Sequence, residues 1–327
     1  MTTVRIGVIG AGHMGHLHAE KVLELSHAGN DLALAGVVDV DAERAQSVAA
    51  ALGTRAVKER SELYEQADAV VVAVATVAHF EVVREALLAG LDVLVEKPIA
   101  VTIEEADELV ALADREGRVL HVGHQEWFNA AMRVVRERIE VPRFAEIHRL
   151  GMFSPRGTDV DVVRDLMIHD IEILQQLIGA EPERVEAVGI PVLTDHVDIA
   201  NARLTFENRC VANLTASRVS MTPMRKFRIF QRDAFFSIDF LEQKAALFRR
   251  YPQGGGAAPR IEMEELKTGP GDALRTQLQA FVDAIQRGSR PSDGANGSAG
   301  VSGREATSAL RTALRVIDAM PSLHDLA

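Results

Sequence analysis

The stretch VRIGVIGAGHMG, residues 4–15, decides the fold of this chain. Its first half is a mostly apolar run, and its second half carries three glycines in the spacing G-x-G-x-x-G. A helix-like run over residues 16–28 follows, and a second apolar run over 33–38 ends at Asp39. A strand, a glycine-rich turn, a helix and a second strand that ends on a carboxylate form the fingerprint of a dinucleotide-binding βαβ unit.

The three glycines have separate steric roles in such a unit. Gly10 allows the tight turn, Gly12 lets the backbone approach a pyrophosphate, and Gly15 lets the helix pack close to the strand. The N-terminus of the helix then faces the phosphates, because its free N–H groups and its dipole attract negative charge. Asp39 is suited to accept hydrogen bonds from the adenosine ribose and would repel a 2′-phosphate. We therefore expect NAD as the cofactor, with NADP disfavoured.

Composition and charge exclude several classes of protein. The chain has 327 residues, 47% apolar and 25% charged, which is typical of a globular protein with two domains. Its net charge of −11 argues against a nucleic-acid partner. A single cysteine rules out an intrachain disulfide, and the histidines of the first helix lack partners at metal-ligand spacing, so we expect no metal. No signal peptide or membrane-spanning stretch is visible, which predicts a cytoplasmic protein without a membrane partner.

Residues 4–122 alternate strand-like and helix-like segments, which predicts a doubly wound parallel sheet. Strands are expected at 4–9, 33–38, 69–74, 92–95 and 119–122, and helices at 16–28, 41–52, 80–89 and 103–116. The last helix is the clearest, because Thr102 and Glu105 can form a capping box and Gly117 can end it. The sequence thus predicts an N-terminal Rossmann domain over residues 1–122.

Beyond residue 122 the pattern changes to consecutive strands. Helices are expected at 129–139 and 162–178, and strands at 184–193, 197–206, 210–219, 225–231, 234–239 and 244–250. Strands without intervening helices imply a large, mainly antiparallel open sheet in an α+β domain over residues 123–327. Segments 254–259 and 288–303, rich in Gly, Ser and Ala, are expected to be loops, and a last helix over 304–320 is expected to pack back on the first domain.

Two groups of residues could carry chemistry. Lys97 follows the apolar strand at 92–95, and ligands bind beyond the carboxyl ends of the strands in an open α/β sheet. We therefore expect Lys97 near the nicotinamide end of a dinucleotide rather than in a solvated loop. Asp165 and His169 are four residues apart in a helical stretch, so they share one face. A carboxylate beside an imidazole can orient it for proton exchange near neutral pH, although this pattern alone favours an ordinary helical pair.

Taken together, the glycine fingerprint, the Glu96-Lys97-Pro98 step and the Asp-x-x-x-His spacing resemble the Gfo/Idh/MocA oxidoreductases over nearly the whole chain. The resemblance implies NAD(P)-dependent oxidation or reduction of a sugar or polyol carbon. It also implies that Lys97 is the catalytic lysine, and that Asp165 and His169 hold and deprotonate the reacting hydroxyl. The open sheet of the second domain commonly forms a subunit interface in this family, so a homodimer or homotetramer is expected.

Three further segments, 155–161, 197–203 and 212–218, resemble a subgroup that oxidises the C3 hydroxyl of UDP-N-acetylglucosamine to the 3-keto sugar on the route to lipid A. The expected substrate is therefore a nucleotide sugar. Two alternatives stay open: a dehydrogenase of the same family for an inositol or a free or phosphorylated sugar, and a dinucleotide-binding regulator without catalysis.

Oxidation of a secondary alcohol requires that the hydroxyl proton is removed as hydride leaves to the nicotinamide. His169 is the preferred proton acceptor with Lys97 as electrostatic partner, and Lys97 as the base is the alternative. Asp165 would orient the hydroxyl or the lysine. The residues expected to contact the cofactor are Gly10, Gly12, His13, Met14, Gly15, Asp39, Thr76, His79, Glu96 and Lys97. Those expected to contact the substrate are His124, Trp127, Arg156, Asp165, His169 and Arg218, with Arg156 as the first candidate for a diphosphate.

Overall fold

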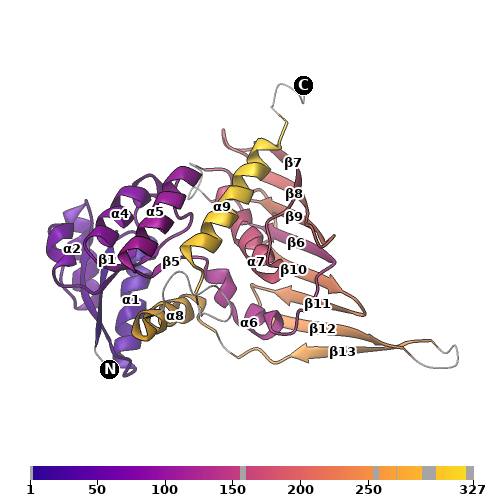
Figure 1. Ribbon diagram of the computed structural model, residues 1–327, viewed down its shortest axis with the longest axis horizontal. Coiled ribbons are helices and arrows are strands. Elements are labelled where there is room, and N and C mark those ends of the chain that lie inside the picture. The colour runs from indigo at the N-terminus through magenta and orange to yellow at the C-terminus, as the bar shows by residue number, and fades with distance from the viewer. Residues whose placement is uncertain (1–2, 155–159, 253–257, 270, 289–299, 322–327) are drawn as a thin grey trace. The chain divides into compact units, whose positions relative to one another are not determined.

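The computed structural model describes residues 3–154, 160–252, 258–269, 271–288 and 300–321 (Figure 1). The chain divides into two compact units, which are Met1–Gln125 with Ala273–Thr307, and Glu126–Asp272 with Ser308–Ala327. The sequence predicted a single division after residue 122. Residues 273–307 instead group with the N-terminal unit, because they include a helix whose apolar face packs on the first helix of that unit.

The first unit is built on a parallel sheet, as predicted. Its described strands are β1 (Val4–Ile9), β2 (Leu32–Val38), β3 (Ala69–Val72), β4 (Asp92–Val95) and β5 (Leu120–Val122), in the order β2-β1-β3-β4-β5. Their Val, Leu and Ile side chains are buried because helices cover both faces. The chain leaves β1 toward β2 on one side and returns to β3 on the other. The carboxyl ends of β1 and β3 therefore form the switch point at which such sheets bind ligands.

The described helices of the first unit are α1 (His13–His27), α2 (Ala42–Leu52), α3 (Arg60–Tyr64), α4 (His79–Leu88), α5 (Ile103–Glu116) and α8 (Ala273–Arg287). Among them, α2 and α5 begin at a residue whose side chain caps them and end at a glycine. In α5, Thr102 accepts the N–H of Glu105 while the Glu105 carboxylate accepts the N–H of Thr102, and Gly117 ends the helix at φ 62°. The predicted capping box and bounds of α5 are confirmed.

Helix α8 lies in a stretch for which no element was predicted from the sequence. Leu278, Phe281 and Val282 on its apolar face join the core formed by α1 and β1. The Phe281 ring also lies 5.7 Å from that of His121 on β5. Its apolar residues recur at helical spacing, so the signal was present, but nothing in the local sequence indicates that the partner is a helix about 250 residues earlier.

The second unit contains a mixed sheet in the order β13-β12-β11-β10-β6-β9-β8-β7 among the described strands. These are β6 (Phe144–Leu150), β7 (Arg184–Ile190), β8 (Ile199–Thr205), β9 (Val211–Ser217), β10 (Met224–Gln231), β11 (Ala234–Asp239), β12 (Lys244–Tyr251) and β13 (Arg260–Leu266). All neighbours are antiparallel except β6 and β9, which confirms the mainly antiparallel sheet. Strand β6 was not predicted, although its side chains alternate in burial, and β13 was missed because it is an exposed edge rich in glutamate.

Helices cover one face of this sheet and leave the other open (Figure 1). They are α6 (Ala130–Arg136), the π-helical turn η3 (Val163–Met167), α7 (Ile168–Ile178) and the second part of α9 (Gly303–Asp318). Ala145 and Ile147 on β6 are buried on the covered face, whereas Glu146 and His148 on the open face are half-exposed. None of the described helices is both long enough and apolar enough to cross a bilayer.

Replacing Thr102 by Ala removes the oxygen that accepts the Glu105 N–H, so the free energy of unfolding should fall by about 1 kcal/mol. Urea unfolding followed by circular dichroism measures the change. The control is Glu105→Gln, whose amide oxygen still accepts the Thr102 N–H, and its loss should be smaller. If Thr102→Ala were as stable as the wild type, the capping box would contribute nothing.

Candidate active site

The glycine-rich turn between β1 and α1 has the geometry that its spacing predicts. Gly10 has a φ of 98°, and a Cβ there would lie 2.4 Å from the carbonyl oxygen of Ala73. A Cβ at Gly15 would lie 1.7 Å from the carbonyl oxygen of Gly10. A Cβ at Gly12 would have no neighbour within 4 Å. The turn thus packs tightly on two sides and is open at Gly12, which fits the approach of a phosphate group.

The open side of the turn borders a cavity of about 1320 Å³, whose lining includes Gly10, Gly12, Asp39, Ala73 and Val82. Gly12 is the N-cap of α1 and has no side chain that could bond the first N–H groups of the helix. Those groups therefore remain available to an anion. His13 and Met14 form the first turn of the same helix, His13 exposed and Met14 half-exposed. The cavity and the helix end fit the dinucleotide that the fingerprint predicts.

Asp39 lines the same cavity next to the glycine turn. Its carboxylate accepts the N–H of Ala11 at 2.6 Å and that of Asp41 at 2.8 Å, so the end of β2 is bonded to the glycine turn. Arg44 lies 3.8 Å from the same carboxylate. Each carboxylate oxygen has two lone pairs, so Asp39 can still accept ribose hydroxyls while it keeps its backbone bonds.

Lys97 is half-buried in the turn that follows β4, next to a cis peptide bond to Pro98. The Glu96 N–H donates to Val72 on β3 at 2.9 Å, which fixes the start of this turn. The Glu96 carboxylate bonds the buried His18 ring of α1 at 2.8 Å and packs against Gly123. Sequence reasoning missed His18 as a partner of this turn, since no local signal links α1 to the end of β4.

His79 is buried against the turn that carries Lys97 and is not exposed to solvent. Its Nδ1 lies 2.8 Å from the carbonyl oxygen of Pro98 and its Nε2 lies 3.1 Å from that of Val74. Burial lowers the pKa of His79, so the ring is neutral at pH 7 and donates to only one of the two carbonyls at a time. His124 is also buried, and burial together with the charge of Lys97 lowers its pKa to about 3. The predicted direct contacts of His79 and His124 with ligands stay predictions.

In the second unit, Asp165 lies on η3 and His169 on the first turn of α7. The predicted helix is therefore present, but its first turn is π-helical, a variant that often occurs at functional sites. Asp165 is half-exposed and His169 is buried. Asp161 caps this segment, because its carboxylate accepts the N–H groups of Val163 at 3.0 Å and Arg164 at 2.9 Å.

A buried ionic network fixes the next residue of the same helix. Asp170 accepts two hydrogen bonds from Arg149 on β6, at 2.8 and 2.9 Å, and Arg149 also donates to Glu126 at 2.7 Å. Half-exposed Arg225 donates to Glu126 at 3.0 Å. Burial opposes the charge of Glu126, but the two arginines outweigh it and lower its pKa. The network anchors α7 to the sheet beside His169, and sequence reasoning did not find it.

The remaining predicted substrate residues lie in different surroundings. Trp127 is buried under the guanidinium of Arg136, whose Cζ is 4.8 Å from the ring centre. Arg218 is buried too and donates to the carbonyl of Val160. Arg156 lies outside the described residues. Thr76 is half-exposed in a short 3-10 turn after β3, near the glycine turn's side of the sheet. The substrate contacts of Trp127, Arg156 and Arg218 and the cofactor contact of Thr76 stay predictions.

Comparisons with known proteins agree with this geometry. The family described as "Oxidoreductase family, NAD-binding Rossmann fold" matches residues 4–124, and the "GFO/IDH/MocA C-terminal domain" matches residues 133–236. UDP-N-acetylglucosamine 3-dehydrogenase of Acidithiobacillus ferrooxidans is 40% identical over 286 residues, which are 87% of this chain and 90% of that protein. The chain belongs to the Gfo/Idh/MocA oxidoreductase family.

Other relatives show how far the Gfo/Idh/MocA likeness extends. Myo-inositol 2-dehydrogenase of Thermotoga maritima is 26% identical over 88% of this chain and 90% of its own length. A solved structure of the Acidithiobacillus ferrooxidans enzyme superposes with a TM-score of 0.88 and 37% identity and covers 98% of both chains. Levoglucosan dehydrogenase, solved with NADH and levoglucosan, reaches a TM-score of 0.83 over 97% of this chain and 96% of its own, at 16% identity. That last likeness shows the fold alone.

Replacing Arg149 by Met should cost about 3–5 kcal/mol of stability, because the buried carboxylates of Asp170 and Glu126 lose their common cation. Burial raises the pKa of Asp170 even beside Arg149. Without the arginine, the folded chain binds protons more tightly than the unfolded chain, so the stability of the variant should fall as pH rises above the ordinary pKa of an aspartate, about 4. Chemical unfolding at several pH values measures both effects.

Arg138→Met is the matched control, because Arg138 forms an exposed ion pair with Glu264 at 3.0 Å. Its loss should be less than about 1 kcal/mol at every pH. Equal losses in the two variants would show that the buried network does not stabilise this unit.

Proposed function

We propose that this chain is an NAD-dependent dehydrogenase that oxidises the C3 hydroxyl of UDP-N-acetylglucosamine to the 3-keto sugar. The observation that carries the proposal is the 40% identity to UDP-N-acetylglucosamine 3-dehydrogenase over 87% of this chain. Lys97, Asp165 and His169 supply the cation, the carboxylate and the imidazole that oxidation of a secondary alcohol uses.

The proposed mechanism assigns one task to each side chain. When bound, the nicotinamide accepts hydride from the sugar carbon. His169 accepts the hydroxyl proton, because imidazole is the side chain best suited to do so near neutral pH. Lys97 donates a hydrogen bond to the same oxygen and stabilises the negative charge that develops there. Asp165, on the turn before His169, orients the hydroxyl by accepting a hydrogen bond from the sugar.

NAD rather than NADP is part of the proposal. The carboxylate of Asp39 lines the cavity beside the glycine turn, and its bonds to Ala11 and Asp41 hold it there. A fixed negative charge at this position would repel a 2′-phosphate and favour the free ribose hydroxyls of NAD. Arg44 lies 3.8 Å from Asp39, where it partly offsets this charge, so the expected preference is a matter of degree.

Oxidation of an inositol is a second candidate. It is favoured by the myo-inositol 2-dehydrogenase of Thermotoga maritima, which is 26% identical over 88% of this chain. A free polyol carries no diphosphate and would not need the cationic contact expected from Arg156. Comparing a nucleotide sugar with a free polyol as substrates therefore separates the two candidates.

The purified chain should form NADH when supplied with UDP-N-acetylglucosamine and NAD, and at least about tenfold more slowly with NADP, because the charge of Asp39 disfavours the 2′-phosphate. Absorbance of the reduced nicotinamide measures the rate. A coupled transaminase with glutamate removes the keto product, so that an unfavourable equilibrium does not hide turnover. Lys97→Ala and His169→Ala should each lower kcat by about 100-fold or more.

Lys267→Ala and His27→Ala, both at exposed positions, are the controls and should keep the wild-type rate. Turnover with inositol but not with the nucleotide sugar would replace the first candidate by the second. Full activity in the Lys97 and His169 variants would remove both residues from the mechanism.

We further propose that the open face of the eight-stranded sheet is an interface between copies of this chain. Four phenylalanines, one on each of four neighbouring strands, stack in series across it, with ring centres 5.6, 5.1 and 4.4 Å apart. The guanidinium of Arg228 lies over two of these rings, at 5.2 and 5.8 Å. Aromatic and arginine side chains are enriched at protein interfaces. The four rings are those of Phe144, Phe230, Phe235 and Phe248.

Light scattering should give the wild-type protein a mass of at least twice 35.6 kDa, and Phe235→Glu should shift it to the monomer, because a carboxylate cannot be buried among stacked rings without a partner. Leu88→Glu, a half-exposed position on α4 of the first unit, is the control and should leave the mass unchanged. A Phe235→Glu protein with the wild-type mass would rule out this face as the interface.

A further inference from the structure

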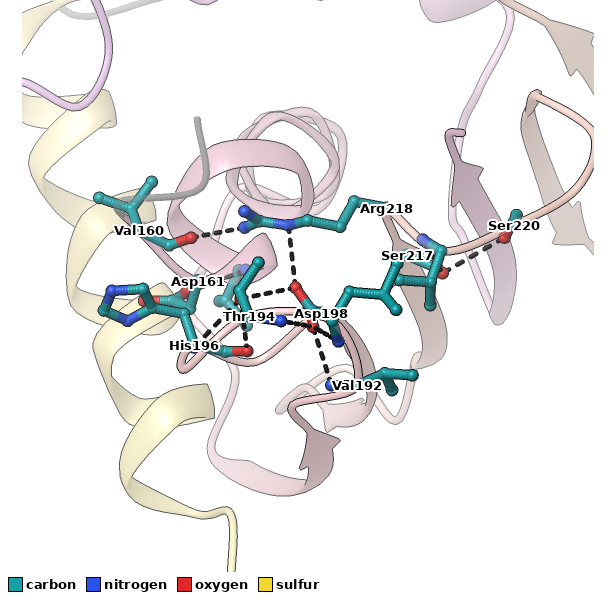
Figure 2. Close-up of polar contacts among 12 residues, drawn as sticks. Val160, Asp161, Val192, Thr194, His196, Asp198, Ser217, Arg218 and Ser220 are labelled. Carbon is teal, nitrogen blue, oxygen red and sulfur yellow. Dashed lines mark hydrogen bonds and ion pairs between the residues drawn. The ribbon is translucent and has the colours of Figure 1, made fainter. Parts of the chain in front are cut away.

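The second unit contains a buried carboxylate whose bonds no catalytic role explains. Asp198, before β8, accepts the backbone N–H groups of Val192, Leu193 and Thr194 at 2.8, 2.6 and 2.9 Å, and the Thr194 hydroxyl at 2.8 Å (Figure 2). Burial opposes its charge, but these hydrogen bonds outweigh burial and lower the pKa of Asp198 to about 2. Asp198 is therefore a fixed buried anion at any ordinary pH.

Arg218 lies between this anion and the start of the helix that carries Asp165. Its Nε is 3.7 Å from the Asp198 carboxylate, and its Nη2 donates to the carbonyl oxygen of Val160 (Figure 2). The Arg218 side chain is only 7% exposed. The backbone N–H of Arg218 also donates to the carbonyl of Asp198 at 3.0 Å. The planar guanidinium thus forms an ion pair with Asp198 through Nε and a hydrogen bond with Val160 through Nη2, two nitrogens at fixed positions on one rigid group.

Hydrogen bonds at three consecutive residues, 160–162, fix the chain just before the π-helical turn. Val160 accepts from Arg218, Asp161 caps the helix, and the N–H of Val162 donates to the carbonyl of Val197 at 3.0 Å. The π-helical turn with Asp165 begins at the next residue. The loop before β8 and the end of β9 thus bond to the residues that precede the π-helical turn and fix where this turn begins.

We propose that Arg218 and Asp198 are positioning residues for the oxidation proposed above, on which this inference rests. Arg218 acts through the carbonyl of Val160: it fixes the start of the π-helical turn and with it the placement of Asp165 and His169. Asp198 keeps the guanidinium in place. This role differs from the direct substrate contact that the sequence predicted for Arg218, and the burial of its side chain favours it.

The size of the expected effect follows from the geometry of proton transfer. A misplacement of about 1 Å of a proton acceptor can cost about 100-fold in rate. Removal of the Val160 bond leaves the Asp161 cap and the Val162–Val197 hydrogen bond as the remaining fixed points before the Arg149–Asp170 pair on α7. The helix should then fray locally while the sheet below keeps its hydrogen bonds.

Amide hydrogen exchange of Arg218→Met and Arg218→Lys tests the proposal together with kinetics. In Arg218→Met, exchange of the amides of residues 162–169 should accelerate at least about tenfold, and kcat with the nucleotide sugar should fall about 10- to 100-fold. The Kd for NADH should stay unchanged, because the glycine turn belongs to the other unit. Arg218→Lys keeps the charge beside Asp198 but cannot reach both acceptors, so its effects should be intermediate.

Arg138→Met is the matched control, because Arg138 is exposed and its ion pair with Glu264 at 3.0 Å does not lie on the open face of the sheet. It should change neither exchange nor kcat. A fall in kcat of Arg218→Met with wild-type exchange over residues 162–169 would overturn the proposal in favour of a direct substrate contact. Wild-type exchange together with wild-type kcat would overturn it as well.

The exchange measurement needs no substrate, so the two proposals fail separately. If the wild-type protein oxidises no nucleotide sugar, the proposed function fails, and exchange over residues 162–169 still decides whether Arg218 anchors this turn. If Arg218→Met does not fold, Arg218→Lys carries the same comparison. A folded Arg218→Lys protein with exchange equal to that of Arg138→Met would overturn the anchoring.

Discussion

The close approach of Gly15 to the carbonyl oxygen of Gly10 is the contact on which the first unit depends. A side chain at residue 15 would lie 1.7 Å from that oxygen, so α1 can lie against the turn only with glycine there. This contact directs the N-terminus of α1 at the cavity and carries His18, further along the helix, to the carboxylate of Glu96. The turn with Lys97 is therefore bonded to the helix whose N-terminus follows the glycine turn, so one helix positions both of the segments proposed to hold the cofactor.

In the second unit, buried ion pairs rather than glycine contacts position the segment that carries Asp165 and His169. Arg149 bonds Asp170 on α7, and Arg218 bonds the chain at Val160, so the segment that carries Asp165 and His169 is held on both sides. Buried ion pairs contribute little net stability compared with apolar packing, but they accept only one arrangement of their partners. For the helix that carries His169, the proposed proton acceptor, a single arrangement of the side chains matters more than added stability.

Local patterns predicted the elements whose signals are local. Helix α5, with its capping box, and the strands at 4–9 and 92–95 have the predicted bounds. The glycine turn was also predictable, because the spacing of its three glycines between a strand and a helix is a local pattern, even though the carbonyl that meets Gly10 belongs to Ala73. The partners of the site were not: His18 with Glu96 and Arg149 with Asp170 are far apart in sequence, and neither pair leaves a pattern in either segment. Such pairs become visible only once the strands between them are assembled.

The three positions of the turn require glycine for different reasons. Gly10 is required because a side chain there would meet the backbone of Ala73, and Gly15 because a side chain there would meet the backbone of Gly10, so a protein that keeps this turn keeps both. A Cβ at Gly12 would meet nothing within 4 Å, so the packing of the chain does not require glycine there, whereas the close approach proposed for a phosphate does. A related protein that no longer binds a dinucleotide could carry another residue at position 12 while it keeps Gly10 and Gly15. The residue at position 12 therefore distinguishes relatives that still bind a dinucleotide from relatives that keep only the fold.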